Sequence, residues 1–535
     1  MRYGGGRKRR MLLQPFLVLC ATVTVVGLLM LALRPLDPPI TVDFARNFEL
    51  GDSNSSRFDA GGAGFVREKP CVTVEEMGKD FENGVVGKET LRVRSMIEDH
   101  FVLNGASRIR DLPPEQFCSH GFVLGKTAEA GFGNEMYKVL TAAALSIMLN
   151  RSLIIGQTRG KYPFGDYISY SNFTFTMNEI KHLWRQNGCE SNYGRQLVMR
   201  TDDFEKPTQT NVLCSNWMEW KQPIIWFQGT TDAMAAQFFL KNIHTEMRIA
   251  AFDLFGDPQV PGSQPNVFGE IMRVLVSPSK DVEAAVNWVI GGGDNPDISL
   301  HMRMLMNRSI RAVQAALHCI KKAIQSQRLM SKPKVVVVSD TPTLVESIMP
   351  NISEFAQFKG NIFEGLPKKD FRVKDWGPAP RWVAFVDFFL ASRAKYAVVS
   401  GAHRRVGTTY AQLIAALAAT RNLGENSTGS SFSFLSSFQS NILTEGLKNQ
   451  IGWGHVWNRY AGPLSCQNQT NQCAFTPLLP PGWWDGLMQS PIPKDISRLA
   501  AYGIRLSTLG TVDYDSLQNH CNSRKNVERT ITFNL

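Results

Sequence analysis

The sequence lacks the patterns that mark zinc-binding and nucleic-acid-binding proteins. No two of its nine cysteines form a Cys-x-x-Cys pair, so a structural zinc site is not expected. No tract of lysine and arginine follows the first ten residues, and no internal repeat is found. The net charge of +11 over 535 residues makes the protein mildly basic. Such a balance suits an anionic small ligand and does not by itself imply nucleic acid.

Charge is absent from residues 11–33, although 20% of the chain is charged. This apolar run is long enough to cross a bilayer as a helix, and the five arginine and lysine residues before it should stay cytoplasmic. Without those five charges the net charge is +6. A cleaved signal peptide is the alternative, but the run is longer than the apolar segment of a signal peptide. We therefore expect a cytoplasmic tail at 1–10, a signal anchor at 11–33 and a lumenal body, as in a type II membrane protein.

One cysteine lies in the expected anchor, and the other eight would face an oxidising lumen, where disulfides form. Sequence alone does not decide their pairing. Cys466 and Cys473 close a short polar loop and are the first expectation, and Cys189 with Cys214 is the second. Sequons for N-glycosylation give weaker support for a lumenal body and occur at Asn54, Asn172, Asn351, Asn426 and Asn468.

The rest of the chain begins with a stem. Residues 34–115 are rich in Pro, Gly, Ser and charge, with some helix expected near 85–102, and Leu112-Pro113-Pro114 should end the segment. Apolar runs and helical periodicity alternate after it. Helices are expected at 136–149, 310–327, 343–348, 382–390 and 408–419, and strands at 153–155, 298–303, 334–339 and 396–400.

This alternation predicts an α/β protein with doubly wound parallel sheets. The valines of 334–339 form a continuous apolar run, as in a strand buried on both faces. We expect an N-terminal Rossmann-like lobe at 116–290, a C-terminal Rossmann-like lobe at 291–425 and a loop-rich, cysteine-containing extension at 426–535. A cleft between two such lobes is a common place for a nucleotide-linked substrate.

Residues 297–309 read DISLHMRMLMNRS and predict a strand with two unlike faces. His301 and Arg303 share one face near the end of that strand. An arginine there can hold a phosphate through two parallel hydrogen bonds, and His301 could reach a second oxygen. An edge strand with one face in water explains the same residues equally well. These residues alone leave both interpretations open.

A glycine-rich loop precedes the first helix of the body. Gly131 and Gly133 allow a tight turn, and the N–H groups of the helix that follows can receive an anion or a sugar hydroxyl. Asn134 adds a side chain that both donates and accepts hydrogen bonds. A lone Gly-x-Gly is a weak signal, so a loop that only starts a helix is the stronger interpretation on composition.

Two acids stand out in the second half of the chain. Asp340 follows the buried strand at 334–339, where it could bind a ligand or cap the next helix. Asp387 is the single acid at the start of an apolar helix.

The strand at 396–400 leads into a cationic loop. Ser400 and Gly401 end the strand, and the potential cations that follow are His403, Arg404 and Arg405. A purely structural loop would rarely tolerate their mutual repulsion, so this loop predicts a phosphate site.

In their order and spacing these motifs resemble the fucosyltransferase superfamily, over about residues 116–420. Gly131-Phe132-Gly133-Asn134 resembles its first-lobe loop, and HMR at 301–303 resembles its His-x-Arg motif. VVVVSDTP resembles its strand that ends in aspartate, and VDFFLASRAKYAVVSG resembles its third motif. The superfamily includes protein O-fucosyltransferases, the bacterial nodulation and core α1,6-fucosyltransferases and plant cell-wall fucosyltransferases. A plant branch with an N-terminal membrane anchor is the most similar.

The resemblance implies a GT-B-like fold, with two lobes facing a cleft, and a Golgi enzyme that transfers fucose from GDP-fucose to a glycan or glycoprotein. Arg303 would grip the β-phosphate with help from Arg404 or Arg405, and Asp387 would read the guanine. With arginines stabilising the leaving GDP, no metal or other cofactor is implied. Glu129 is the implied catalytic base, and Glu135 flanks the same loop.

The residues implied for the nucleotide sugar are His301, Arg303, Asp340, Asp387, Ser400, Gly401, His403, Arg404 and Arg405, and those for the acceptor and donor cleft are Gly131, Phe132, Gly133, Asn134 and Glu135. Two other functions stay open. The chain could be an inactive relative that binds a glycan or scaffolds Golgi enzymes, alone or as an oligomer, or it could use another nucleotide sugar. No nucleic-acid partner is expected.

Overall fold

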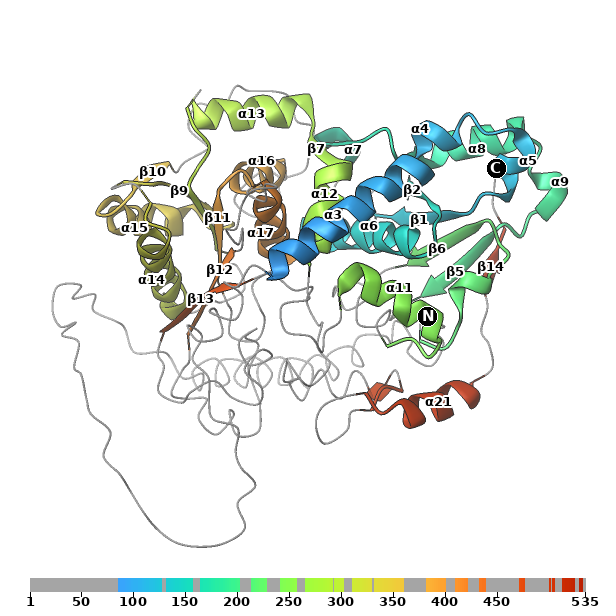
Figure 1. Ribbon diagram of the computed structural model, residues 1–535. Coiled ribbons are helices and arrows are strands. Elements are labelled where there is room, and N and C mark those ends of the chain that lie inside the picture. The colour runs from blue at the N-terminus through green and yellow to red at the C-terminus, as the bar shows by residue number, and fades with distance from the viewer. Residues whose placement is uncertain are drawn as a thin grey trace, which may run out of the picture. The chain divides into compact units, whose positions relative to one another are not determined.

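The computed structural model describes residues from 85 onward (Figure 1). The described ranges are 85–127, 131–156, 164–202, 213–228, 241–256, 265–291, 293–302, 310–329, 332–359, 382–400, 409–421, 433–438, 471–476, 500–501, 503–505, 512–524 and 529–532. The chain divides into two compact units, Met1–Glu68 and Lys69–Leu535, and every described residue belongs to the second. The expected cytoplasmic tail and the anchor at 11–33 therefore lie outside the described residues. No helix within the described ranges is both long and apolar enough to span a bilayer.

The first sheet has six strands in the order β14-β5-β6-β1-β2-β4. Its strands are β1 Phe122–Lys126, β2 Ser152–Gly156, β4 Phe175–Thr176, β5 Val198–Asp202, β6 Ile224–Gln228 and β14 Arg529–Ile531. All neighbouring pairs are parallel except β14 with β5. β1 and β2 are buried along nearly their whole length, because a parallel sheet is covered on both faces.

Helices and short elements surround this sheet. They are α3 Val85–Asn104, α4 Ala106–Ile109, α5 Pro114–Ser119, α6 Phe132–Met148, α7 Phe164–Tyr167, α8 Met177–Gln186, α9 Glu190–Tyr193, α11 Thr245–Phe255, α12 Val267–Leu275 and the 3-10 turn Trp217–Glu219. β3 Ile168–Tyr170 and β7 Val276–Pro278 form a separate antiparallel pair. Helix α6 packs on β1 and β2, and α8 packs on β2 and β4. The local sequence starts α8 with a capping box, in which Thr176 and Glu179 bond each other's backbone N–H groups.

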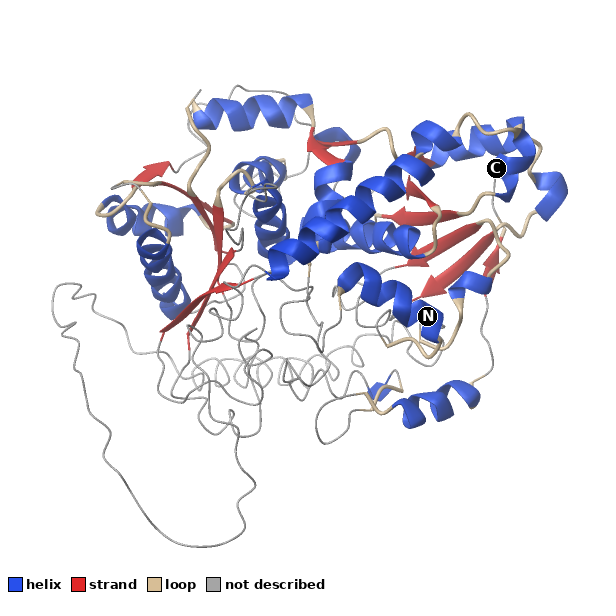
Figure 2. Ribbon diagram, in the orientation of Figure 1, coloured by secondary structure: helices blue, strands red, loops and turns tan. Residues whose placement is uncertain are grey.

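The second sheet also has six strands, in the order β10-β9-β8-β11-β12-β13. Its strands are β8 Ile298–Met302, β9 Lys334–Ser339, β10 Gln357–Lys359, β11 Tyr396–Ser400, β12 Ser433–Phe438 and β13 Asn471–Thr476. The helices after β7 are α13 Lys280–Ile290, α14 Ile310–Ser326, α15 Pro342–Ser353, α16 Val383–Ala391, α17 Thr409–Arg421 and α21 Tyr514–Asn522. Figure 2 shows α14 and α15 on one side of the sheet and α16 and α17 on the other. The predicted α/β class with parallel sheets is therefore confirmed, with one antiparallel edge strand in each sheet, and helices cover both faces of the second sheet.

The alternation in β8 does not mark an edge strand. β8 lies between β9 and β11, and its burial leaves only His301 partly exposed. Ser299, which the alternation would place toward water, is 1% exposed. The edge-strand interpretation is wrong because both faces of a central parallel strand are covered by helices.

The expected stem does not reach residue 115. Val93, Ile97 and Phe101 recur every four residues along α3 and are buried in the apolar core of the body. Arg94 on the same helix pairs with the buried Glu270 of α12, at 2.9 Å. The helix expected near 85–102 is therefore present as α3, but it belongs to the folded unit and not to a stem.

The C-terminal extension is also part of the two sheets. β12 continues the second sheet in parallel with β11, and β13 closes it as an antiparallel edge strand. β14 adds an antiparallel edge to the first sheet. The tail expected from its loop-rich composition therefore supplies strands at both sheet edges.

The disulfides differ from both expected pairs. The bonds found among the described residues join Cys118 to Cys189, Cys214 to Cys521 and Cys319 to Cys473. The expected Cys466–Cys473 and Cys189–Cys214 pairs are therefore wrong. The bonds that form join cysteines 71 to 307 residues apart, which folding brings together. Short separation in sequence carried no information about which side chains the helices and strands would place in contact.

Candidate functional site

The second sheet has a point where the order of its strands reverses. The chain runs from β8 outward through β9 to β10, and then returns to the other side of β8 with β11. His301 and Val399 are register partners at the carboxyl ends of β8 and β11. Ligands of open α/β sheets bind in the crevice outside such a reversal point. The elements that end or begin there define the candidate site.

His301 faces the helices that follow β10 and β11. It is partly buried, and its ring lies 4.8 Å from the ring of Tyr410 in the first turn of α17. The Tyr410 hydroxyl donates a hydrogen bond to the carbonyl oxygen of Ala384 in α16. Met302, on the opposite face of β8, is fully buried. His301 is therefore directed to the side of the sheet that α16 and α17 cover.

Asp340 lies at the carboxyl end of β9. The Thr341 hydroxyl donates to its Oδ1 at 3.4 Å, and the Thr341 N–H donates to Ser339 Oγ at 3.2 Å. Thr341 occupies the N-cap position of α15 without a side-chain capping bond. The capping alternative is therefore wrong for Asp340, which precedes the N-cap position, and Asp340 remains a candidate for ligand binding.

Asp387 is the acid of α16, and the residues beside it, Val386 and Phe388, are buried. Burial raises the pKa of the Asp387 carboxyl to about 8. Its buried Oδ1 has no hydrogen-bond partner. An unpaired buried carboxyl oxygen is costly unless a ligand satisfies it, so Asp387 is the strongest binding candidate among the described residues.

The first turn of α6 meets the first turn of α17. Asn134 Oδ1 accepts a hydrogen bond from Thr409 Oγ1 at 2.9 Å. A Cβ atom on Gly133 would lie 2.6 Å from both Thr409 Oγ1 and Tyr410 N, so only glycine permits this approach. Phe132 is buried, and its ring centre lies 4.7 Å from that of Phe388. These residues bind the N-terminal turns of two helices to each other beside the reversal point.

Glu135 differs from its neighbours in the same turn. Its side chain is fully buried, and Lys138 Nζ lies 3.0 Å from its Oε1. Gly131, which precedes the helix as its N-cap, has nothing within 4 Å of where a Cβ would lie. Of the expected cleft residues, Gly131 is thus the open one and Glu135 is engaged inside the fold.

The other expected residues lie outside the described ranges. These are Glu129, Arg303, Gly401, His403, Arg404 and Arg405, and only the backbone of Ser400 is described. Sequence reasoning overlooked Thr409 and Tyr410. The available signal was the Gly407-Thr408-Thr409 stretch, which directly follows the arginine loop and starts the next helix.

No group of three potential metal ligands occurs among the residues that the structure describes. One Asp-x-Asp sequence does occur, at 513–515, at the start of α21. Asp513 caps that helix by accepting the N–H of Ser516 at 3.0 Å. Its local contact is therefore structural.

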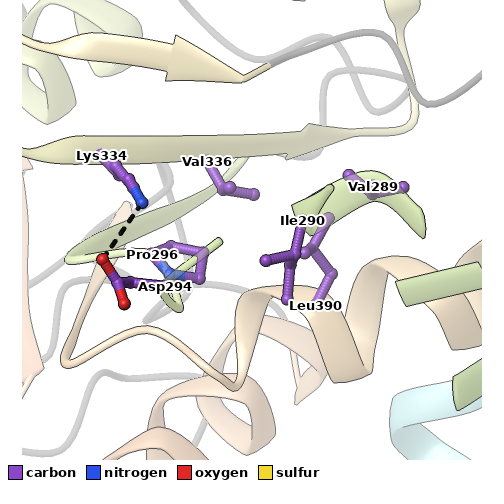
Figure 3. Close-up of a pocket in the computed structure, with 7 residues that line it drawn as sticks. All are labelled: Val289, Ile290, Asp294, Pro296, Lys334, Val336 and Leu390. Atoms are coloured by element: carbon purple, nitrogen blue, oxygen red, sulfur yellow. Dashed lines mark ion pairs between the residues drawn. The ribbon is translucent and has the colours of Figure 1, made fainter. Parts of the chain in front are cut away.

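A small pocket lies near the amino ends of the strands of the second sheet, opposite the carboxyl ends that border the candidate site (Figure 3). Its apolar wall includes Ile290 and Leu390, and Lys334 Nζ lies 3.6 Å from Asp294 Oδ2 at its rim. Lys334 begins β9, whereas Asp340 follows its end. The pocket holds about 10 Å³, enough for about one water molecule, and it is separate from the candidate site.

Three solved structures show what the chain is similar to. A mutant of Arabidopsis thaliana FUT1 in complex with GDP is 11% identical, with a TM-score of 0.42 over 65% of this chain and 79% of that chain. NodZ alpha-1,6-fucosyltransferase soaked with GDP-fucose, an enzyme known from Bradyrhizobium, is 12% identical, with a TM-score of 0.35 over 60% and 95%. POFUT1 in complex with GDP-fucose is 13% identical, with a TM-score of 0.33 over 59% and 98%.

Fucosyltransferase structures are thus among those similar to this chain, as the motifs predicted. Likeness at these TM-scores carries no argument about activity. A comparison with curated proteins finds no match. The family model that matches is DUF7810, described as a family of unknown function, and it covers residues 66–533. Because that match spans most of the sequence, the chain belongs to the DUF7810 family.

Proposed function

We propose that this protein is a glycosyltransferase that transfers fucose from GDP-fucose to a glycan or glycoprotein. One observation carries the proposal. Asp387 is a half-buried acid whose buried Oδ1 has no hydrogen-bond partner, and it comes from a helix that borders the point where the strand order reverses. Such a site suits a ligand that brings its own hydrogen-bond donors, as a nucleotide base does.

The donor would lie across the carboxyl ends of β8, β9 and β11. Asp387 would accept N–H groups of the guanine, and His301 and Asp340 would border the ribose and phosphates. Arg303, with Arg404 or Arg405, would stabilise the charge that develops on the leaving GDP, without a metal ion. Glu129 would take the proton of the acceptor hydroxyl; Glu135 is less suited, since Lys138 already engages it.

The proposed location is the Golgi membrane, with the body in the lumen. The uncharged run at 11–33, the positive charges before it and the disulfides of the body support this topology. Protease treatment of intact microsomes should leave the body undigested until detergent is added. Digestion without detergent would exclude a lumenal body.

Calorimetry on the full-length protein tests the proposed donor. GDP and GDP-fucose should bind, and UDP should bind more weakly because its base presents a different donor pattern. If UDP binds as tightly as GDP, the choice of donor is wrong, and if no nucleotide binds, the transferase proposal fails.

Arg303 supplies the matched test within the site. Arg303→Ala should weaken GDP binding by about 30- to 150-fold, as expected for the loss of a charge-assisted pair worth roughly 2–3 kcal/mol. Arg303→Lys should weaken it less, because lysine keeps the charge and loses the bidentate geometry. Equal affinity in wild type and Arg303→Ala, with both folded, would remove Arg303 from the site.

A further inference from the structure

A row of two cations and an indole crosses three neighbouring strands of the first sheet. Lys126 ends β1, Trp226 lies on β6 and Arg200 lies on β5. Lys126 Nζ is 5.3 Å from the centre of the Trp226 ring, and Arg200 Cζ is 4.9 Å from it. All three side chains are partly exposed. We call Lys126, Trp226 and Arg200 the cationic row.

The strand register places one further cation, Arg529, and one polar residue, Gln228, beside this row. Arg529 on β14 is the register partner of Arg200, so the two arginines share a face, and Arg529 is exposed. Gln228, two residues after Trp226, has a buried Oε1 with no hydrogen-bond partner. The same face is apolar nearer the amino ends of the strands, where Phe122, Val198 and Ile224 are buried. Toward the carboxyl ends, where α/β sheets bind ligands, the face therefore changes from core to a charged surface with three basic residues, Lys126, Arg200 and Arg529, and one acid, Asp202, the register partner of Gln228.

The indole of Trp226 stabilises the two cations close to each other. Each cation is attracted to the electron-rich ring, which offsets part of their mutual repulsion and orients both side chains. Lys126 and Arg200 lie on strands separated by one strand, so they are about 10 Å apart across the sheet, and Arg529 extends the line by about 5 Å. A single phosphate or carboxylate is too small to contact cations at that spacing. An extended chain that carries repeated negative charges matches this spacing.

We propose that the cationic row binds an acidic glycan, a chain of sugars that carry carboxylates, as the acceptor of this enzyme. The inference rests on the proposed transferase function, which requires a glycan-binding surface besides the donor site. Lys126, Arg200 and Arg529 pair with successive carboxylates, and Gln228 accepts a sugar hydroxyl. The carboxylates are recognised and remain unchanged, since the sugar is transferred to a hydroxyl.

Binding of the full-length, detergent-solubilised protein to polygalacturonate tests this site. Methyl-esterified polygalacturonate is the matched ligand, because it keeps the sugar chain and loses the charge without altering the protein. The native polymer should bind at least about tenfold more tightly than the ester. Equal affinity for the two would overturn the proposal. Equal or tighter binding of single-stranded DNA would show a general polyanion surface and would also overturn it.

Variants then locate the site. Lys126→Gln and Arg200→Gln should each weaken polygalacturonate binding by about tenfold, and Arg200→Lys should retain more affinity than Arg200→Gln. Lys221→Gln removes an exposed charge beyond the amino end of β6 and should change nothing. Loss of binding in Lys221→Gln to the same extent would refute a localised site.

GDP affinity, measured on every variant, separates this inference from the proposed function. It should stay unchanged in the row variants, which also shows that they are folded. If GDP binds and polygalacturonate does not, the acidic acceptor is wrong while the donor proposal stands. If polygalacturonate binds through the row and GDP does not bind, the donor proposal fails and the row is a glycan-binding surface only.

Discussion

At the scale of single residues, the buried ionisable groups make the most specific statements about this protein. Asp387 keeps a carboxyl in an apolar helix without a partner for Oδ1, which costs folding free energy and has no structural return among the described contacts. The buried His100 of α3 and the half-buried His120, whose ring packs against Phe122 of β1, form a second group of ionisable residues. Asp387 should make GDP affinity depend on pH, and the two histidines should make the stability of the fold depend on pH.

GDP binding should release a proton from Asp387. With a pKa of about 8, the free carboxyl is mostly protonated at pH 7, and a base that donates N–H groups to it requires the ionised form. Affinity should therefore rise by up to about tenfold per pH unit as pH approaches 8 from below, and level off above it. Calorimetry in buffers with different ionisation enthalpies measures the released proton. Asp387→Asn should abolish the release, and a release of the same size in that variant would exclude Asp387 as its source.

The histidine pair should make the fold sensitive to acid. Burial lowers the pKa of His100 to about 4, and partial burial together with the charges of Arg151 and Arg108 lowers the pKa of His120 to about 4 as well. In the unfolded chain both would titrate near their ordinary value of 6.5. Their contribution to stability is thus complete above pH 6.5 and is lost as pH falls toward 4, by about 3 kcal/mol for His100.

Urea unfolding at a series of pH values measures this loss. His100→Gln should flatten the decline between pH 6.5 and 4, because glutamine does not titrate. His182→Gln changes an exposed histidine on α8 and should leave the decline as it is. A wild-type protein whose stability is constant over that range would contradict the assignment of two neutral histidines in the folded state.

At the scale of elements, α17 is the helix that connects the second sheet to the helices of the first. Its first turn is bonded to α6 through Thr409 and Asn134. Farther along, Asn266 at the start of α12 donates to the carbonyl oxygen of Ala416 at 2.7 Å. At its end, Arg94 donates to the carbonyl oxygen of Thr420 at 2.9 Å. A helix that follows a strand of the second sheet is therefore fastened along its length to helices of the first, and residues from one face of each sheet belong to a common apolar cluster.

A methyl group at Gly133 should disturb this junction. Gly133→Ala would place Cβ 2.6 Å from backbone and side-chain atoms of α17, so the helices would have to separate. The free energy of unfolding should fall by about 1–3 kcal/mol, as in overpacked cores, and GDP binding should weaken if the site lies beside the junction. Gly131→Ala is the matched control, since its Cβ would meet nothing within 4 Å. Equal melting temperatures for the two variants would show that the junction tolerates separation.

At the scale of the whole molecule, the disulfides tie distant parts of the chain to the sheets. Cys319 of α14 holds Cys473 of β13, the edge strand of the second sheet, and Cys521 of α21 is tied to Cys214. These bonds close loops of 154 and 307 residues. The edge strand β13 and the helix α21 are thus held covalently as well as by packing, as is usual in proteins that fold in oxidising compartments.

Peptide mapping without reduction should recover the pairs Cys118–Cys189, Cys214–Cys521 and Cys319–Cys473. Loop-closure entropy predicts that losing one of these bonds lowers the free energy of unfolding by about 4–6 kcal/mol. Cys319→Ala and Cys473→Ala should therefore lower the melting temperature to a similar extent, and the double variant should be no less stable than either. Recovery of a Cys466–Cys473 peptide would contradict the arrangement described here.

Much of the second sheet was predictable because its strands carry local signals. The valine run at 334–339 and the segment at 396–400 became β9 and β11 with the predicted bounds. The helix expected at 310–327 ends one residue earlier, at Ser326. The position of β8 in the sheet was not predictable from its alternation, since a buried Ser299 and an exposed serine look the same in sequence.

The sequence by itself determined the α/β class, the order of the elements, the apolar run at 11–33 and the fucosyltransferase-like motifs, because these depend on periodicity and on residues close together along the chain. Only the tertiary structure decided which cysteines pair, that α3 belongs to the body, that Thr409 meets Asn134, and that Lys126, Trp226 and Arg200 stand in one row. Each of these joins residues that are far apart in sequence. Their contacts follow from the strand order and the packing of helices on the sheets, which no local pattern encodes.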